Sequence, residues 1–281
     1  MSAWKIAAVQ MDVHFGQVAR NLGHIREKLA EAAGQGARLV IFPECALTGY
    51  CFESKDEAWP VSESFPGPST EALAADCRRL GVWAIVGGLE RAEEGRLFNV
   101  CALVGPDGFV ASYRKTHLPF LGVDRFTTPG DRPFAVHDLG GLRVGMLICY
   151  DGSFPEAARV LMLQGADLVT LSTNWPTGAM TTVQYLVQAR ALENQLYFAG
   201  VNRVGEERGF SFIGRSRLVD VSGNLLAVSE DEHATILYAD IDPERARRKH
   251  IVKVPGKYEL DRVNDRRPEL YEVLTRRKEK P

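Results

Sequence analysis

Short apolar runs rich in β-branched residues alternate with amphipathic helical patterns along this chain, and this rhythm restricts the fold more than any other feature. Lys5–Gln10 predicts a strand, Val18–Ala33 a helix and Arg38–Phe42 a buried strand. Further helices are expected at Thr70–Leu80, Phe154–Gln164 and Met180–Asn194, and further strands at Trp83–Leu89, Leu142–Ile148, Asp167–Leu171, Leu196–Val201 and Thr235–Ile241. Strands mixed with helices predict an α/β protein.

Two hairpins add antiparallel strands to this pattern. Asn99–Val104 and Phe109–Arg114 flank the turn sequence Gly105-Pro-Asp-Gly108, and Arg217–Val221 and Leu225–Val228 flank Ser222-Gly-Asn224. Mixed sheets covered by helices are therefore expected, rather than a barrel. No Pro/Gly/Ser-rich linker interrupts the chain, so we expect one domain over residues 1–243. The charged segment 244–281 is expected to be a tail, which frays or packs on a partner subunit.

The composition excludes several classes of protein. A net charge of −2 with 25% charged residues argues against nucleic acid as a partner. Five cysteines without metal-ligand spacing are typical of a reducing compartment. There is no signal-peptide pattern, and no apolar run reaches the ~20 residues that cross a membrane. We therefore expect a soluble cytoplasmic protein with no membrane contact.

Three expected strands end in a reactive side chain. Glu44 follows the buried run Arg38–Phe42, Lys115 ends a hairpin strand, and Cys149 ends Leu142–Ile148. Ligands gather at the carboxyl ends of strands in open α/β sheets, so all three side chains could face one crevice.

Cys149 has the strongest local chemistry. It precedes the helix at Phe154–Gln164, whose positive end would favour the thiolate, and a sharp turn there would free the Tyr150 N–H for an oxyanion. The alternative is that Cys149 is a small buried hydrophobe. The latter interpretation is preferred for the other cysteines, which are Cys45, Cys51, Cys77 and Cys101.

The partners of such a thiol can be of two kinds. A desolvated Glu44 with a raised pKa could accept its proton, and Lys115 could stabilise a developing oxyanion, although a solvated surface position is the alternative for each. His117 is the competing base, but the sequence offers no evident Asn or Asp to orient it. Phosphate-binding glycine loops and the Gly-x-Ser-x-Gly motif are absent.

Six sequence blocks in order give the chain a recognisable resemblance. They are LVIFPECALTGY, YRKTHLP, GMLICYDGSFPEAAR, ADLVTLSTNWP, QARALENQLYFAGVNRVG and FIGRSRLVDVSGNLL. Together they resemble the nitrilase superfamily of carbon–nitrogen hydrolases, over Lys5 to about Ile241. The resemblance implies a four-layer α-β-β-α sandwich whose subunits pair into a homodimer or higher homo-oligomer, often with help from the C-terminal tail.

The resemblance also implies the roles of the matching residues. Glu44 would be the general base, Cys149 the nucleophile and Lys115 the stabiliser of the tetrahedral intermediate, with the Tyr150 amide as a second oxyanion donor. No metal or organic cofactor is implied. Many members carry a second glutamate after the lysine, whereas the loop 116–130 here has only Asp124, which we expect to replace it with help from the backbone at Gly122.

The substrate is expected to be a small amide, because Cys149-Tyr-Asp resembles the amidase and carbamoylase branches more than the nitrilases. An N-carbamoyl (ureido) compound or a nitrile is the alternative, and a non-catalytic protein that binds a metabolite or partner is the alternative of a different class. Residues beside the triad blocks are candidates for the pocket: Tyr50, Phe120, Phe126, Asn174 and Trp175. Arg125 or Arg203 could bind a substrate carboxylate.

Overall fold

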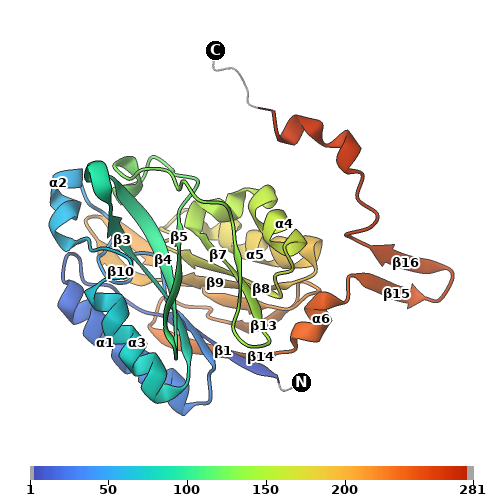
Figure 1. Cartoon of the computed structure of the whole chain (residues 1–281), viewed down its shortest axis with the longest axis horizontal. Helices are drawn as coiled ribbons and strands as arrows, with labels where there is room; N and C mark the ends of the chain where they lie inside the picture. The colour runs from blue at the N-terminus through green and yellow to red at the C-terminus, as the bar shows by residue number, and fades with distance from the viewer. Residues whose placement is uncertain (1–2, 277–281) are drawn as a thin grey trace. The chain divides into compact units, whose positions relative to one another are not determined.

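The computed structural model describes residues 3–276, which form two compact units (Figure 1). The first unit runs to Arg247 and the second begins at Arg248. Helix α6 (Pro243–Arg247) closes the first unit, where Arg247 pairs with Asp167. The first four residues of the expected tail therefore pack in the first unit. Residues 1 and 2 of the expected domain and residues 277–281 of the expected tail lie outside the described part of the chain.

The first sheet has six strands, of which three neighbours are parallel. Their order is β14 (Thr235–Ile241), β1 (Trp4–Gln10), β2 (Leu39–Ile41), β3 (Trp83–Arg91), β4 (Leu97–Gly105) and β5 (Gly108–Arg114). Strands β14, β4 and β5 pair antiparallel with their neighbours. Since β4 reverses the direction of β3 and β5 reverses it again, β5 runs the same way as β2. Glu44 and Lys115 therefore follow strands that end at the same edge.

The second sheet repeats this plan. Its order is β13 (Leu225–Val228), β12 (Arg217–Val219), β9 (Tyr197–Asn202), β8 (Leu168–Thr173), β7 (Arg143–Ile148) and β6 (Val136–Asp138). The strands β7, β8 and β9 are parallel. Cys149 thus follows β7 and Asn174 follows β8 at one edge of this sheet.

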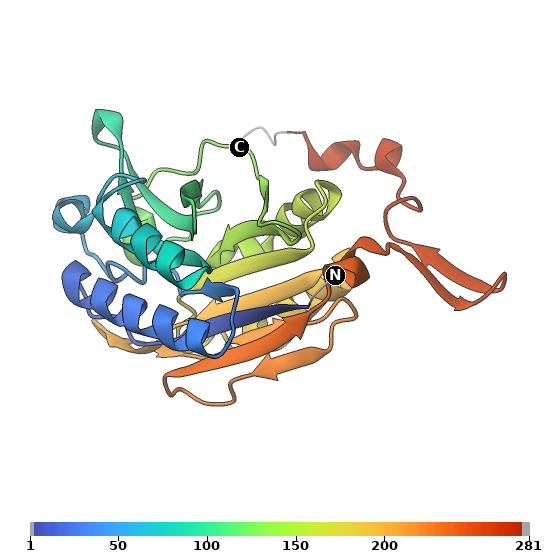
Figure 2. The same cartoon turned by 60° about the horizontal axis from the view of Figure 1, so that its bottom comes forward.

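Helices cover the outer face of each sheet (Figures 1 and 2). Helices α1 (Val18–Gly34) and α3 (Pro68–Leu80) pack on the first sheet, and α4 (Pro155–Leu163) and α5 (Met180–Asn194) belong to the second. The sheets contact each other through β1 with β9, β4 with β7 and β12 with β14. The expected four-layer α/β sandwich is confirmed.

The strands pack on both faces because alternate side chains point in opposite directions. On β1, Ala7 and Val9 join the core beneath α1, where they meet Ile25. Ile6 faces the other way, toward Leu168 of the second sheet. This explains why the strands read as continuous apolar runs rather than as an alternating pattern.

Several short elements were not predicted from the sequence. The helices and strands among them are α2 (Lys55–Ala58), α6, β6, the hairpin β10 (Val204–Glu207) and β11 (Phe210–Ile213), and the hairpin β15 (His250–Val254) and β16 (Tyr258–Asp261) of the second unit. The 3₁₀ turns are η1 (Trp59–Val61), η2 (Glu93–Gly95), η3 (Gly122–Arg125), η4 (Cys149–Ser153), η5 (Pro268–Leu270) and η6 (Glu272–Leu274). Strand β10 reads Val-Gly-Glu-Glu, without an apolar stripe, and β15–β16 lie in charged sequence. Packing of the second unit on a partner subunit stays a prediction.

No helix within residues 3–276 combines the length and the apolar character that crossing a membrane requires.

The close approach of β3 to the segment that carries Glu44 makes a testable prediction. A Cβ added at Gly87 would lie 2.5 Å from both the Cys45 nitrogen and the Pro43 oxygen, which are backbone atoms. We expect Gly87→Ala to lower the free energy of unfolding by about 1–3 kcal/mol through overpacking, measured by urea titration. Gly23→Ala, where α1 has open space, is the matched control and should not destabilise. Equal midpoints for Gly87→Ala and the unmodified protein would contradict the prediction.

Candidate active site

Glu44 is completely buried at the carboxyl end of β2. Its Oε1 accepts hydrogen bonds from Lys115 Nζ at 2.7 Å and from Asn99 Nδ2 at 2.8 Å. Its Oε2 is buried and has no hydrogen-bond partner among residues 3–276. Burial raises the pKa of Glu44, and the Asp124 charge adds to this, so that the opposing effect of Lys115 is outweighed. This carboxylate is therefore suited to accept a proton.

Lys115 lies between two carboxylates. Its Nζ donates to Asp124 Oδ2 at 2.5 Å as well as to Glu44, and all three side chains are completely buried. Burial by itself would lower the pKa of Lys115, but the charges of Asp124 and Glu44 outweigh it and hold that pKa well above its ordinary value. Lys115 is thus a fixed positive charge.

Asp124 lies in η3, where its carboxylate makes three hydrogen bonds. It accepts from Lys115, from Tyr50 Oη at 2.8 Å and from Asn99 Nδ2 at 2.9 Å. Gly122 permits this arrangement, because a Cβ there would lie 2.4 Å from the Tyr50 ring. The backbone thus approaches as closely as a shorter acid requires, although the part that Asp124 plays stays a prediction.

Cys149 directly follows β7 and begins η4 with φ +43°, a left-handed conformation that is rare outside glycine. Burial raises the pKa of the Cys149 thiol, and Glu44 raises it further, so the thiol form is favoured. The effect of the helix dipole on the thiol stays a prediction, and burial and the neighbouring Glu44 charge oppose it.

Cys45 is the other thiol beside Glu44, but its surroundings differ. It is completely buried, and its sulfur lies 3.6 Å from Asn99 Oδ1. Of the five cysteines, Cys149 is partly exposed and the other four are buried. Partial exposure therefore distinguishes Cys149 from Cys45.

His117 has an orienting carboxylate that the sequence did not reveal. Its Nδ1 lies 2.7 Å from Asp151 Oδ1, and its ring stacks on Phe154 at 3.7 Å between centroids. The buried Asp151 also accepts from Tyr113 Oη and from the Ile148 N–H, which adjoins Cys149. The expectation that His117 lacks an orienting Asp is therefore wrong. Asp151 links the segment after Lys115 to the turn of Cys149.

The expected pocket residues occupy different surroundings. Tyr50 and Trp175 are buried, and Tyr50 acts as a support of Asp124. Asn174 is buried with both side-chain amide atoms unpartnered among the described residues, so its amide is available to a ligand. Tyr150 is 40% exposed and Phe120 is 91% exposed.

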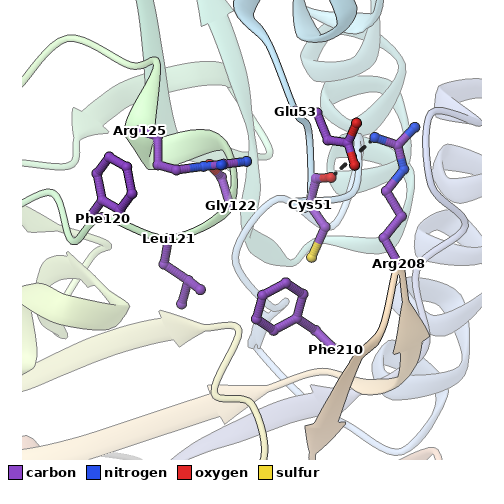
Figure 3. Close-up of a pocket in the computed structure, with 8 residues that line it drawn as sticks. All are labelled: Cys51, Glu53, Phe120, Leu121, Gly122, Arg125, Arg208 and Phe210. Atoms are coloured by element: carbon purple, nitrogen blue, oxygen red, sulfur yellow. Dashed lines mark hydrogen bonds between the residues drawn. The ribbon is translucent and has the colours of Figure 1, made fainter.

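A cavity of about 390 Å³ lies next to the segments that carry Tyr50 and Asp124, and Figure 3 shows the residues that line it. Its lining includes Leu121 and Gly122, which precede Asp124, and Cys51, which follows Tyr50. Cys149 is not part of the lining. The remaining lining residues are Glu53, Phe120, Arg125, Arg208 and Phe210.

The two arginines that were considered for a substrate carboxylate differ in availability. Arg203 is completely buried and binds Glu207 and Asp12, so it is not available to a substrate. Arg125 lines the cavity and hydrogen-bonds the Gly122 and Phe52 carbonyl oxygens.

Three residues of this region were missed in the sequence: Asn99, Asp151 and Glu207. Asn99 had a detectable signal, because it is a polar residue within the otherwise apolar run Leu97–Gly105. Glu207 had none, since its partners are distant in the chain. Within residues 3–276, no three His, Cys, Asp or Glu side chains are grouped as a metal site would require.

Comparison with known proteins places this site in a family. The sequence pattern described as carbon–nitrogen hydrolase matches residues 5–250. A protein named nitrilase from Pyrococcus abyssi is 37% identical and covers 95% of this chain and 98% of its own. An (R)-stereoselective amidase from a Pseudomonas species is 36% identical and covers 87% of this chain and 88% of its own. The omega-amidase of Homo sapiens is 33% identical and covers 86% of this chain and 90% of its own.

Solved structures agree with the sequence comparisons. An amidase from Nesterenkonia sp. superposes with a TM-score of 0.81 and 25% identity, covering 97% of both chains. A variant of that amidase carries the acetamide moiety of fluoroacetamide covalently bound at its active-site cysteine. The chain described here belongs to the carbon–nitrogen hydrolases of the nitrilase superfamily.

Proposed function

We propose that this protein hydrolyses the carbon–nitrogen bond of a small amide, with Cys149 as the nucleophile. The observation that carries the proposal is the contact between Glu44 and Lys115, both completely buried, whose charges act on the Cys149 thiol. A buried charged pair is costly unless it is used or well compensated. The amidases among the relatives support the same reaction.

The first half-reaction forms a thioester. Glu44 takes the proton of Cys149 through its unpartnered Oε2 while the sulfur attacks the carbonyl carbon, whose oxygen becomes an oxyanion. When the intermediate collapses, the carbon–nitrogen bond breaks and the nitrogen receives the proton from Glu44. Ammonia or an amine leaves, and the acyl group remains on Cys149.

The second half-reaction releases the acid. Glu44 takes a proton from water, the resulting hydroxide attacks the thioester, and the carbon–sulfur bond breaks as the proton returns to the sulfur. In both halves Lys115 and the Tyr150 N–H stabilise the oxyanion. Tyr150 is the second residue of η4, where a 3₁₀ turn leaves its first N–H groups without partners inside the turn. Removing one such donor commonly costs ~10²–10³ in rate.

An amide whose far end is a carboxylate is the second candidate substrate. Arg125 supports it, because this cation lines the cavity beside Asp124 and no described carboxylate forms an ion pair with it. The relatives named omega-amidase are consistent with this candidate.

Replacement of the nucleophile tests the reaction class. We expect Cys149→Ala to abolish ammonia release from every active compound in a screen of amides, ω-amides, ureido acids and nitriles. The control is Cys77→Ala, because Cys77 is a core residue of α3 outside the site, so its replacement should leave the rate unchanged. Unchanged ammonia release from Cys149→Ala would contradict the mechanism, and no release from any compound would favour a non-catalytic binding protein. Mass spectrometry of the trapped thioester should place the acyl group on Cys149 rather than Cys45.

Replacement of the base separates the two possible mechanisms. Glu44→Gln should lower kcat/KM by at least ~10², whereas His117→Ala should retain turnover. In the unmodified protein, kcat/KM should fall as the pH drops through the raised pKa of Glu44, because the protonated acid cannot accept the thiol proton. The opposite pattern, in which His117→Ala is inactive and Glu44→Gln is active, would support a Cys–His mechanism.

The substrate carboxylate is tested at Arg125. If the guanidinium binds it, Arg125→Gln should raise KM about tenfold or more for an ω-amide with a free carboxylate and leave KM for the corresponding neutral amide unchanged. Steady-state kinetics with the matched pair of substrates measures this. Equal changes for the two substrates would rule out a carboxylate subsite at Arg125.

A further inference from the structure

The ion pair between Arg203 and Glu207 lies outside the group of Glu44, Lys115 and Cys149 and is completely enclosed. Arg203 Nη1 donates to Glu207 Oε2 at 2.6 Å, and the side chains are 0% and 2% exposed. Arg203 Nη2 also donates to the Val13 carbonyl oxygen and to Asp12, and its guanidinium lies 4.3 Å from the centre of the Phe212 ring. A buried ion pair by itself is weak support for stability, so its other contacts matter.

The second oxygen of Glu207 holds a distant segment of the chain. Its Oε1 accepts from two consecutive main-chain N–H groups, those of Tyr50 at 2.7 Å and Cys51 at 2.5 Å. One carboxylate therefore joins the guanidinium of Arg203 to the backbone that carries the Tyr50 ring. These two hydrogen bonds fix the main chain from which the Tyr50 side chain extends.

Tyr50 in turn holds the loop of Asp124 by three contacts. Its hydroxyl donates to Asp124 Oδ2 at 2.8 Å, its carbonyl oxygen accepts from the Val123 N–H at 2.8 Å, and its ring fills the space that a side chain at Gly122 would need. The position of Tyr50 thus decides the position of Asp124. Lys115 contacts the same oxygen, Asp124 Oδ2.

We propose that Arg203 and Glu207 are positioning residues of the active site, which act through Tyr50 and Asp124 to hold Lys115 against Glu44. The proposal rests on the amide hydrolysis described above. An aspartate is one methylene shorter than a glutamate, so its carboxylate reaches Lys115 only if the backbone is held near. The pair supplies that restraint from Arg203, which directly precedes β10, and from Glu207, which ends it.

Glu207→Gln is the direct test. A glutamine side chain has one acceptor oxygen and one NH₂ group, so it cannot accept from both Arg203 and the two N–H groups. We expect kcat to fall about tenfold to a hundredfold with little change in KM, because small displacements of catalytic groups cost this much. Tyr50→Phe should have a similar effect, and the double variant should be no slower than the slower single variant, since both interrupt one chain of contacts.

The pH dependence provides a readout that a purely structural role would not move. The titratable groups around Asp124 are Lys115, Glu44, Tyr50, Cys45 and Cys149. Because the Asp124 charge raises the pKa of Glu44, displacing it should move the acid limb of kcat/KM to lower pH. Glu207→Gln should shift this limb in the same direction as Asp124→Asn.

Asp167→Asn is the matched control. Asp167 is also buried and also joins an arginine, Arg247 at 2.8 Å, to a main-chain N–H, that of Arg143 at 2.9 Å. Asp167 directly precedes β8 and Asn174 directly follows it, so Asp167 lies at the end of this strand that is away from the active site. Loss of its carboxylate should therefore lower Tm without changing kcat or the acid limb of kcat/KM. If Glu207→Gln lowers Tm as Asp167→Asn does and leaves kcat and the limb unchanged, the positioning role is refuted. Additive effects of Glu207→Gln and Tyr50→Phe would also refute it.

A measurement without turnover separates this proposal from the proposed function. The pH dependence of Cys149 alkylation by iodoacetamide, followed by mass spectrometry of the labelled peptide, reports the charges around the thiol. Glu207→Gln and Asp124→Asn should shift its midpoint in the same direction, and Asp167→Asn should not shift it. Were amide hydrolysis absent, this shift would still reveal the coupling; an unshifted midpoint in Glu207→Gln would overturn the coupling even in an active hydrolase.

Discussion

The contact of one buried ammonium with two buried carboxylates is the interaction on which the rest of the site depends. Lys115 binds Glu44 and Asp124 at 2.7 and 2.5 Å, and no part of the three side chains reaches solvent. Two negative charges and one positive charge leave an excess negative charge in a poorly solvated place. Such a group persists only when every member is held by hydrogen bonds, which Asn99 and Tyr50 supply.

Burial and the neighbouring carboxylates explain the roles that we propose for these residues. Burial raises the pKa of Glu44 and that of the Cys149 thiol, and the nearby carboxylate charges add to both increases, so a neutral thiol faces a carboxylate that accepts protons readily. A thiol in this setting is activated at the moment of attack rather than stored as a thiolate. The positive charge of Lys115 is then available to the oxyanion. The proposed mechanism therefore uses no imidazole, although His117 is oriented nearby by Asp151.

The site is assembled from both sheets. Glu44 and Lys115 follow strands of the first sheet, while Cys149 and Asn174 follow strands of the second. A hydrogen bond of 2.8 Å from Ser172 Oγ to the Phe42 carbonyl oxygen joins the two sheets where these strands end. Packing of the two inner faces thus determines how far the Cys149 thiol lies from Glu44. The Arg203–Glu207 pair adds a further restraint, because Glu207 holds the main chain of Tyr50 and Cys51.

The sequence by itself determined the longer helices and strands and the strand ends where Glu44, Lys115 and Cys149 lie, because apolar periodicity and strand-end position are local properties. The four-layer sandwich was predicted from the resemblance of its sequence blocks to a family. The strand Thr235–Ile241 and the helix Met180–Asn194 agree with the structure residue for residue. Only the tertiary structure decided the direction in which the pKa of Cys149 shifts, the carboxylate beside His117 and the burial of Arg203. Glu207 and Tyr50 are 157 residues apart in the chain, so no local pattern could connect them. Ionisation and ion pairing depend on which distant groups share a buried volume, and that volume exists only once both sheets have packed.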